Sequence, residues 1–151
     1  MQATYDDAKL ILKLYELRRE EELRKARAWF GAQFSAASAE EMMKKYTFGS
    51  QENTYIRMVI GYWDMACSFV TSGVLNQELF LESAGELLVV WGKIRPVIDD
   101  FRKVMRNPKA WSNLEAVGNA AVEHLKSKGP EAYQALQEMM AQVAAASAAK
   151  A

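Results

Sequence analysis

The amino-acid sequence predicts an all-α protein, a single-domain helical bundle of about six or seven helices around a central antiparallel helical hairpin. Apolar residues recur at steps of three and four along most of the chain, which places them on one face of a helix. No run alternates polar and apolar residues over the length of a strand between turn residues. With 151 residues, 50% of them hydrophobic, the chain is long enough for one domain with a substantial core.

The stretch from Asn53 to Gly73 organises this prediction. Two adjacent apolar lines run along it at helical spacing: Tyr55, Val59, Tyr62, Ala66, Phe69 and Gly73 in one, and Ile56, Ile60, Trp63, Cys67, Val70 and Val74 in the other. Two adjacent lines make a face too wide for a helix with a single partner. We therefore expect a central helix with others packed around it, ended by Gly73 as a C-cap glycine.

A second helix is expected directly after the first. Only two residues separate Gly73 from Asn76, which has the side chain of a helix N-cap, and the next apolar stripe runs to Ile94. A link this short forces neighbouring helices to lie antiparallel. We expect the hairpin of Tyr55–Gly73 and Asn76–Ile94 at the centre of the bundle.

The N-terminal part also has helical signals. Thr4 and Asp7 resemble a capping pair, and they are followed by an apolar stripe of Leu10, Ile11, Leu14 and Leu17. From Arg18 to Arg27 the residues are mostly charged, with both signs spaced for weak ion pairs along a helix. This segment predicts one long helix or two with a bend near Glu20. A solvated surface is favoured over an electrostatic surface for a partner.

The remaining boundaries follow from caps and prolines. A serine-to-glutamate capping box at Ser38 opens a short helix, and Pro96 should kink or restart a helix. Asn107-Pro108 is typical of an N-cap followed by the first helical residue, and Gly129 ends that helix. A last helix follows. We expect one domain over residues 1–143 and a frayed alanine-rich tail over residues 144–151.

The composition argues against several classes of function. Basic and acidic residues are equal at 19 each, so no long-range field attracts nucleic acid, and we expect no nucleic-acid partner. The one cysteine, Cys67, lies in an apolar line, which is typical of an inert buried thiol. The N-terminus does not resemble a signal peptide, and no apolar run approaches the length of a membrane span. We expect a cytoplasmic protein.

Motifs for catalysis and for metal binding are not found in the sequence. The one histidine, His124, has no glutamate three residues before it, as a helical di-iron site would require. Glu78, Glu82 and Glu86 share a helix face, but adjacent like charges are more typical of solvated surface. No phosphate-binding loop and no nucleophile elbow is present. We therefore expect no enzymatic activity, no metal and no cofactor.

One polar strip on the central helix is the candidate site. It carries Arg57 and Asp64 two turns apart, with Gly61 between them. A glycine within a helix costs about 1 kcal/mol relative to alanine, so it indicates either a close helix approach or a small pocket. In a pocket, Arg57 would hold an anionic ligand. The walls of that pocket would be aromatic: Tyr62, Trp63 and Trp91. A purely structural role for the strip is favoured.

Part of the chain resembles an uncharacterised family of bacterial helical proteins. The segments that carry the resemblance are YDDAKLILKLYELRREEELRKARAWF, GYWDMACSFVTSGVLNQELF and VWGKIRPVIDDFR, and they lie within residues 5–106. The most specific part is Tyr62–Ala66. The resemblance implies an all-helical domain of unknown function, and it implies no activity, so no functional residue is carried over from it.

Two functions are consistent with the sequence. The first is a non-enzymatic domain that binds a protein partner or a second copy of itself, because zero net charge leaves self-association unopposed and the helices are rich in aromatic residues. The second is a small-ligand sensor or regulatory domain with a polar pocket on the central helix. Whether the face from Arg57 to Asp64 is a cavity, an interface or open surface distinguishes them.

Overall fold

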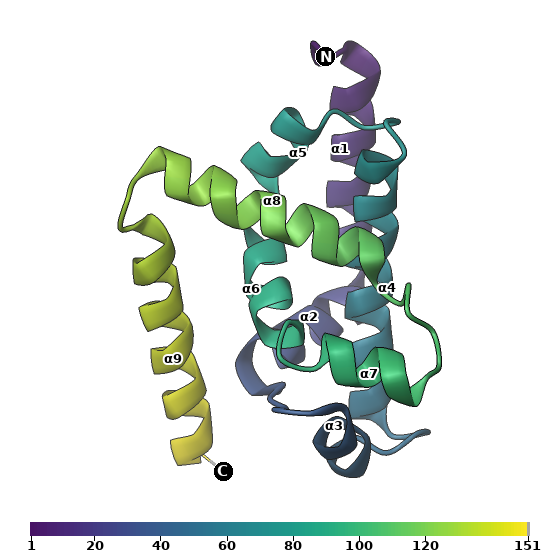
Figure 1. Cartoon of the computed structure of the whole chain (residues 1–151), viewed down its shortest axis with the longest axis vertical. Coiled ribbons are helices and arrows are strands. Elements are labelled where there is room, and N and C mark those ends of the chain that lie inside the picture. The colour runs from purple at the N-terminus through teal and green to yellow at the C-terminus, as the bar shows by residue number, and fades with distance from the viewer. Residues whose placement is uncertain (151) are drawn as a thin grey trace.

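The computed structural model describes residues 1–150, which form nine helices and no strand (Figure 1). The helices are α1 (Tyr5–Arg18), α2 (Glu21–Gln33), α3 (Ala39–Lys45), α4 (Gln51–Thr71), α5 (Gln77–Ser83), α6 (Gly85–Ile94), α7 (Ile98–Val104), α8 (Ser112–Lys128) and α9 (Ala132–Lys150). The all-α class is confirmed. The predicted number of helices was too low, because the chain breaks both at Glu20 and at Ala84.

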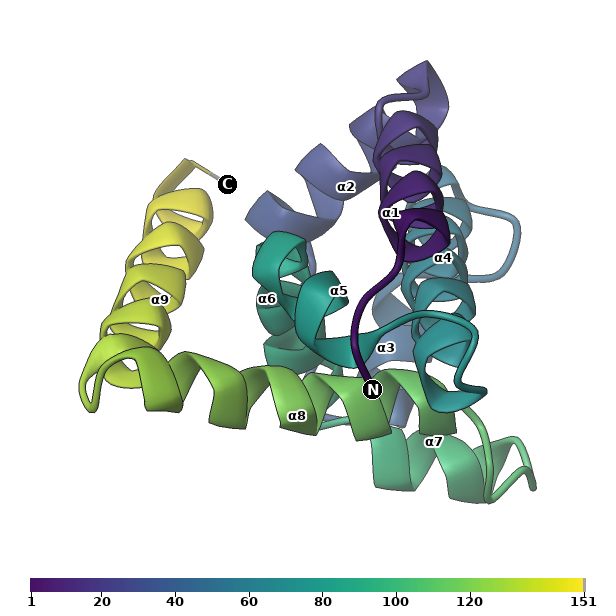
Figure 2. The same cartoon turned by 90° about the horizontal axis from the view of Figure 1, so that it is seen from above.

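Helix α4 is the central helix of the molecule, as predicted. It packs mainly against α2 and α8, and α8 crosses both α4 and α6 (Figures 1 and 2). Its buried residues are Ile56, Val59, Ile60, Tyr62, Trp63, Ala66, Cys67 and Val70. Gly73 follows the helix with a left-handed φ of +77°, which confirms the glycine C-cap. Val74, expected on an apolar line, lies beyond the helix and is 64% exposed.

The predicted central hairpin is wrong in two respects. The expected helix from Asn76 to Ile94 is divided at Ala84 into α5 and α6. Gly85 begins α6, and a glycine is a weak helix former that makes an interruption there inexpensive. The main neighbours of α4 are α2 and α8, so the centre of the bundle is not α4 with the helix that follows it.

Most predicted helix starts are confirmed by their capping hydrogen bonds. The Thr4 hydroxyl accepts from the backbone N–H of Asp7, and the Asp7 carboxylate accepts in return from the Thr4 N–H at 2.7 Å. Ser38 and Asn76 cap α3 and α5 as predicted, but the capping box at Ser38 is only half formed, because the Glu41 carboxylate accepts from the N–H of Ala37 and not from that of Ser38. Within the charged segment the two-helix alternative holds, because the Glu20 carboxylate caps the start of α2.

The predicted start of α8 at Asn107-Pro108 is wrong. The Asn107 side chain accepts from the Lys109 N–H at 3.1 Å and so closes a turn, and α8 begins only at Ser112. Trp111, directly before α8, has a left-handed φ of 55°. Its ring stacks on Phe101 with centroids 3.9 Å apart, which holds this turn against α7.

Helix α9 differs from the others because none of its residues is buried. It lies to one side of the body and touches α2 and α8 (Figure 1). The helix continues through the alanine-rich segment to Lys150, and Ala151 lies outside the described residues. That this tail frays stays a prediction, as does the boundary at residue 143.

Candidate functional site

Arg57, the predicted anion-binding residue, is exposed on α4 and has local partners. Its Nε donates to the Asn53 side-chain oxygen at 3.2 Å, one turn away on the same helix. Its guanidinium lies 5.4 Å from the centre of the Phe48 ring, which is itself exposed. A cation over an exposed aromatic face is a weak interaction of about 0.5–1 kcal/mol. Arg57 is therefore positioned by its own helix and the turn that precedes it.

Asp64 has a different partner and a clear structural role. Its Oδ1 accepts from the backbone N–H of Leu114 at 2.9 Å. That N–H belongs to the first turn of α8, where backbone donors have no partner within the helix. A Cβ added to Gly61, between the two polar residues, would meet nothing within 4 Å, so no neighbouring helix makes close contact there. The structure does not bring Arg57 and Asp64 into one set of hydrogen bonds.

The three predicted aromatic walls are all buried, and the polar atom of each ring already has a partner. The hydrogen bonds are Tyr62 hydroxyl to the Leu14 carbonyl (2.7 Å), Trp63 Nε1 to Glu86 (3.3 Å) and Trp91 Nε1 to Asn119 (3.2 Å). Burial raises the pKa of Tyr62 to about 12. Tyr62 and Trp63 meet edge to face at 5.2 Å, whereas Trp91 belongs to the contact between α6 and α8.

A small crevice adjoins Tyr62 and Trp63. It is also lined by Arg18, and its free volume is about 10 Å³, roughly the space of one water molecule. Beside it the Arg27 guanidinium binds the Glu86 carboxylate through Nε at 2.8 Å and donates to the Arg18 carbonyl at 2.8 Å. These contacts join α1, α2, α4 and α6. Tyr62 and Trp63 thus belong to a polar connection within the core, whereas Trp91 does not, and the role of all three in ligand binding stays a prediction.

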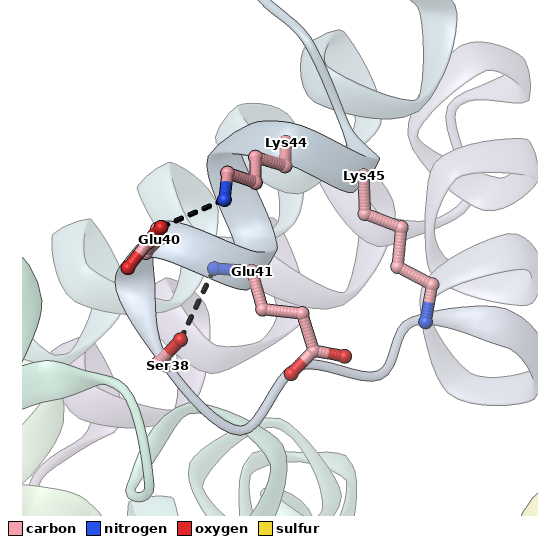
Figure 3. A pocket seen from close by; sticks show the side chains of 5 residues that line it. All are labelled: Ser38, Glu40, Glu41, Lys44 and Lys45. Carbon is pink, nitrogen blue, oxygen red and sulfur yellow. Dashed lines mark hydrogen bonds and ion pairs between the residues drawn. The ribbon is translucent and has the colours of Figure 1, made fainter.

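An open hollow lies over α3, as Figure 3 shows. Its polar side chains are already engaged: Lys44 with Glu40 at 2.7 Å, and the Ser38 hydroxyl with the backbone N–H of Glu41 at 3.1 Å (Figure 3). The Glu41 carboxylate turns back to the N–H of Ala37. These are the ordinary capping bonds and ion pairs of a short surface helix. Lys45 also lines the hollow; its Nζ donates to the Ser35 carbonyl at 3.1 Å and forms no ion pair within residues 1–150.

The most unusual surface of the molecule is the outer side of α1, which we call the α1 face. It carries three large apolar side chains on one line, and their exposed fractions are 76% for Tyr5, 64% for Leu12 and 51% for Tyr15. The residues of the α1 face are Tyr5, Ala8, Lys9, Leu12, Tyr15, Glu16 and Arg19, which immediately follows the helix. Sequence reasoning missed this face, although the steps of seven and three between its apolar members are visible in the sequence.

The opposite side of α1 explains why these residues point outward. Leu14 is buried in the core, and Leu10 and Ile11 pack against it. Asp7 is also buried, and its Oδ1 accepts from the backbone N–H of Asn76 at 2.7 Å. The Thr4 hydroxyl, together with the N–H groups of Asn76 and Thr4, lowers the pKa of Asp7. With this side of the helix fixed, the stripe centred on Leu12 faces solvent.

The charges of the α1 face are held only by exposed partners. Lys9 lies 3.7 Å from Asp6 and 4.7 Å from the centre of the Tyr5 ring. Glu16 pairs with Lys13 at 3.1 Å. Exposed pairs of this kind contribute about 0–1 kcal/mol each, so they are easily exchanged for other partners.

Most of the chain matches a known protein family. Residues 3–120, which include α1 to α7 and the first half of α8, match the model of a domain of unknown function, DUF4760. The chain belongs to the DUF4760 family. The expectation of an uncharacterised helical family is thereby confirmed. No curated protein and no solved structure gives a significant match to the chain.

The DUF4760 match includes the α1 face and the predicted polar strip, whereas α9 lies outside it. Among the helices of residues 1–150, none is both long and apolar enough to cross a bilayer. Within the same residues, histidine, cysteine and acidic side chains do not gather in groups of three that would hold a metal ion. Cys67 is buried, and burial raises the pKa of its thiol to about 12.

Proposed function

We propose that this DUF4760 domain is a non-enzymatic interaction domain that associates with a second copy of itself through the α1 face. The observation that carries the proposal is the exposure of Tyr5, Leu12 and Tyr15 on one line of one helix. Exposed apolar side chains are common singly, but a contiguous row bordered by charges is typical of a protein contact.

The α1 face is complementary to itself when two copies lie antiparallel. Positions 5 and 19, 8 and 16, and 9 and 15 are equally distant from Leu12 in the sequence. A two-fold axis at Leu12 therefore brings the two residues of each pair to the same height along the two helices, and the flank on which each residue lies decides which side chain of the second copy it meets. Leu12 would meet Leu12 of the second copy at the centre of an isologous contact.

The side chains on the two flanks of the stripe support this pairing. At 3.6 residues per turn, Lys9 and Glu16 fall on one flank, and Ala8 and Tyr15 fall on the other. In the antiparallel arrangement Lys9 would lie beside Glu16 of the second copy, and Tyr15 would cover the small Ala8. Tyr5 would lie beside Arg19 of the second copy as a cation–π pair. In a parallel two-fold arrangement the flanks would be exchanged, so Lys9 would instead lie beside Ala8 of the second copy and Glu16 beside Tyr15.

The proposed contact is small, so association should be reversible. One helix face per copy buries less than the roughly 800 Å² per partner of a standard stable interface. The net charge of zero gives no repulsion between copies. We expect a dimer that forms in the micromolar range and dissociates on dilution.

Sedimentation velocity over a series of concentrations tests the proposal with two matched variants. Leu12→Glu places a charge at the proposed two-fold axis, and Val74→Glu places one at an equally exposed apolar residue elsewhere, since both side chains are 64% exposed. We expect reversible dimers for the natural chain and for Val74→Glu, and monomers for Leu12→Glu. The proposal would be refuted if the natural chain were monomeric at every concentration, or if both variants lost dimer formation to the same extent.

The alternative function is a small-ligand sensor. The polar strip from Arg57 to Asp64 does not support this function, because the two residues bind separate partners within the protein. A different feature supports ligand binding, namely a basic hollow beneath α9.

A further inference from the structure

A hollow of about 630 Å³ lies between the last turns of α9 and the body of the domain. Four elements form its walls: the end of α2 with the following loop, the end of α3, α6 and α9. The side of the body that faces α9 can be followed in Figure 2. Volumes of about 300–1,000 Å³ are usual for small-molecule sites.

Among residues 1–150, the charged side chains that line this hollow are all of one sign. Lys45, Lys93 and Lys150 line it, and the lining includes no aspartate or glutamate. Within residues 1–150, none of the three lysines forms an ion pair, whereas five other lysines of the same residues do so on their own helices. In a chain with equal numbers of acids and bases, three uncompensated ammonium groups around one hollow indicate a site for negative charge.

Lys93 is the most informative member of this group. Its side chain on α6 is half-buried, and Nζ donates to the carbonyl of Phe34 at 2.8 Å. An ammonium group carries three donors, so two remain for another acceptor. Burial lowers the pKa of Lys93, because water is partly removed and no carboxylate replaces it. An anion in the hollow would supply the missing negative charge.

We propose that this hollow binds a small oxyanion with at least two negative charges, held by Lys93 and Lys45 from the body and by Lys150 from α9. Neutral hydrogen-bond donors are also in place, since Gln33, Ser35 and Ser147 line the same hollow. Phosphate groups and polycarboxylates share this chemistry, and both form charge-assisted hydrogen bonds with lysine.

The proposed anion site does not depend on the proposed self-association. It shares no residue with the α1 face, and Lys150 lies outside the DUF4760 match. An anion bound between α9 and the body would hold α9 in place, because it would bridge lysines of both. Binding would therefore stabilise α9 specifically, in a molecule where that helix has no buried residue.

Calorimetric titration and thermal unfolding with pyrophosphate and with citrate test the proposal, with potassium chloride at equal ionic strength as the baseline. Lys93→Met removes the half-buried charge and keeps most of the length of the side chain. Lys103→Met removes an exposed charge on α7 and serves as the matched control. Removing an uncompensated half-buried charge should not unfold the domain, and Lys45→Met gives a second variant on another wall.

We expect at least one anion to raise the unfolding temperature of the natural chain above the chloride baseline. Affinity should fall about tenfold in Lys93→Met, equivalent to the loss of one charge-assisted contact, and stay unchanged in Lys103→Met. A response to pyrophosphate alone identifies phosphate chemistry, a response to citrate alone identifies carboxylates, and a response to both identifies polyvalent oxyanions in general. No effect of either anion beyond chloride, or equal affinity in Lys93→Met and Lys103→Met, would overturn the proposal.

Discussion

Helices α1 and α4 use their aromatic residues in opposite ways. In α4, Tyr62 and Trp63 are buried, and each donates a hydrogen bond to a group inside the protein. In α1, Tyr5 and Tyr15 are exposed, and within residues 1–150 neither hydroxyl forms a hydrogen bond with the protein. The difference shows that the aromatic residues of α4 are completed by the fold itself, whereas those on the outer side of α1 face solvent, and the proposed self-association rests on this exposure.

The largest predicted effect is the loss of Trp63. We expect Trp63→Ala to lower the free energy of unfolding by about 3–5 kcal/mol, because it opens a cavity in the core. It also removes the indole N–H that binds Glu86 beside the ion pair with Arg27. Urea denaturation followed by circular dichroism measures this change. A loss below about 1 kcal/mol would show that α4 is not the completed centre of the fold.

Two glycines provide a matched pair with opposite predicted signs. A Cβ at Gly118 on α8 would lie 2.6 Å from Cγ of Trp91, whose indole is held by Asn119, so one of the two must move. We expect Gly118→Ala to cost about 1–3 kcal/mol in unfolding free energy through overpacking.

At Gly61 on α4 the added Cβ would meet nothing within 4 Å. Gly61→Ala should therefore stabilise the protein by about 0.5–1 kcal/mol, since alanine is the better helix former. The same urea titration compares both variants. Destabilisation by Gly61→Ala would indicate that its polar strip has a neighbour after all.

The smallest predicted effect concerns α1. With the protein dilute enough to be monomeric, Tyr15→Ala should change the free energy of unfolding by less than about 0.5 kcal/mol, because the side chain is half-exposed and has no partner in the core. The same variant should weaken dimer formation in concentrated samples. A loss of monomer stability comparable to that of Trp63→Ala would mean that Tyr15 belongs to the core.

Much of the fold could be predicted from local signals. The predicted helix caps occur at their predicted positions, because a cap depends on only a few neighbouring residues. They are the N-caps Thr4, Ser38 and Asn76 and the glycine Gly73 at the end of α4. The break at Ala84 and the late start of α8 could not be predicted. They depend on which helices pack together, and tertiary contacts override weak local preferences.

The candidate site was harder to predict for the same reason. Periodicity placed Asp64 on the one polar strip of an apolar helix. It could not show the partner of Asp64, which is the backbone N–H of Leu114, 50 residues further along the chain. The basic hollow joins Lys45, Lys93 and Lys150, which no local pattern connects. The α1 face was present in the sequence as a second stripe beside Leu10 and Leu14. A search restricted to the core-facing stripe overlooks it.

A reciprocal exchange of charge on the α1 face tests the central claim most directly. In the proposed antiparallel dimer Lys9 would lie beside Glu16 of the second copy, twice per dimer. Lys9→Glu and Glu16→Lys should each weaken the dimer about fivefold or more in sedimentation equilibrium, through like charges placed together. The double variant Lys9→Glu/Glu16→Lys should restore an affinity close to that of the natural chain. A double variant that binds no better than the single variants would contradict the antiparallel α1 contact.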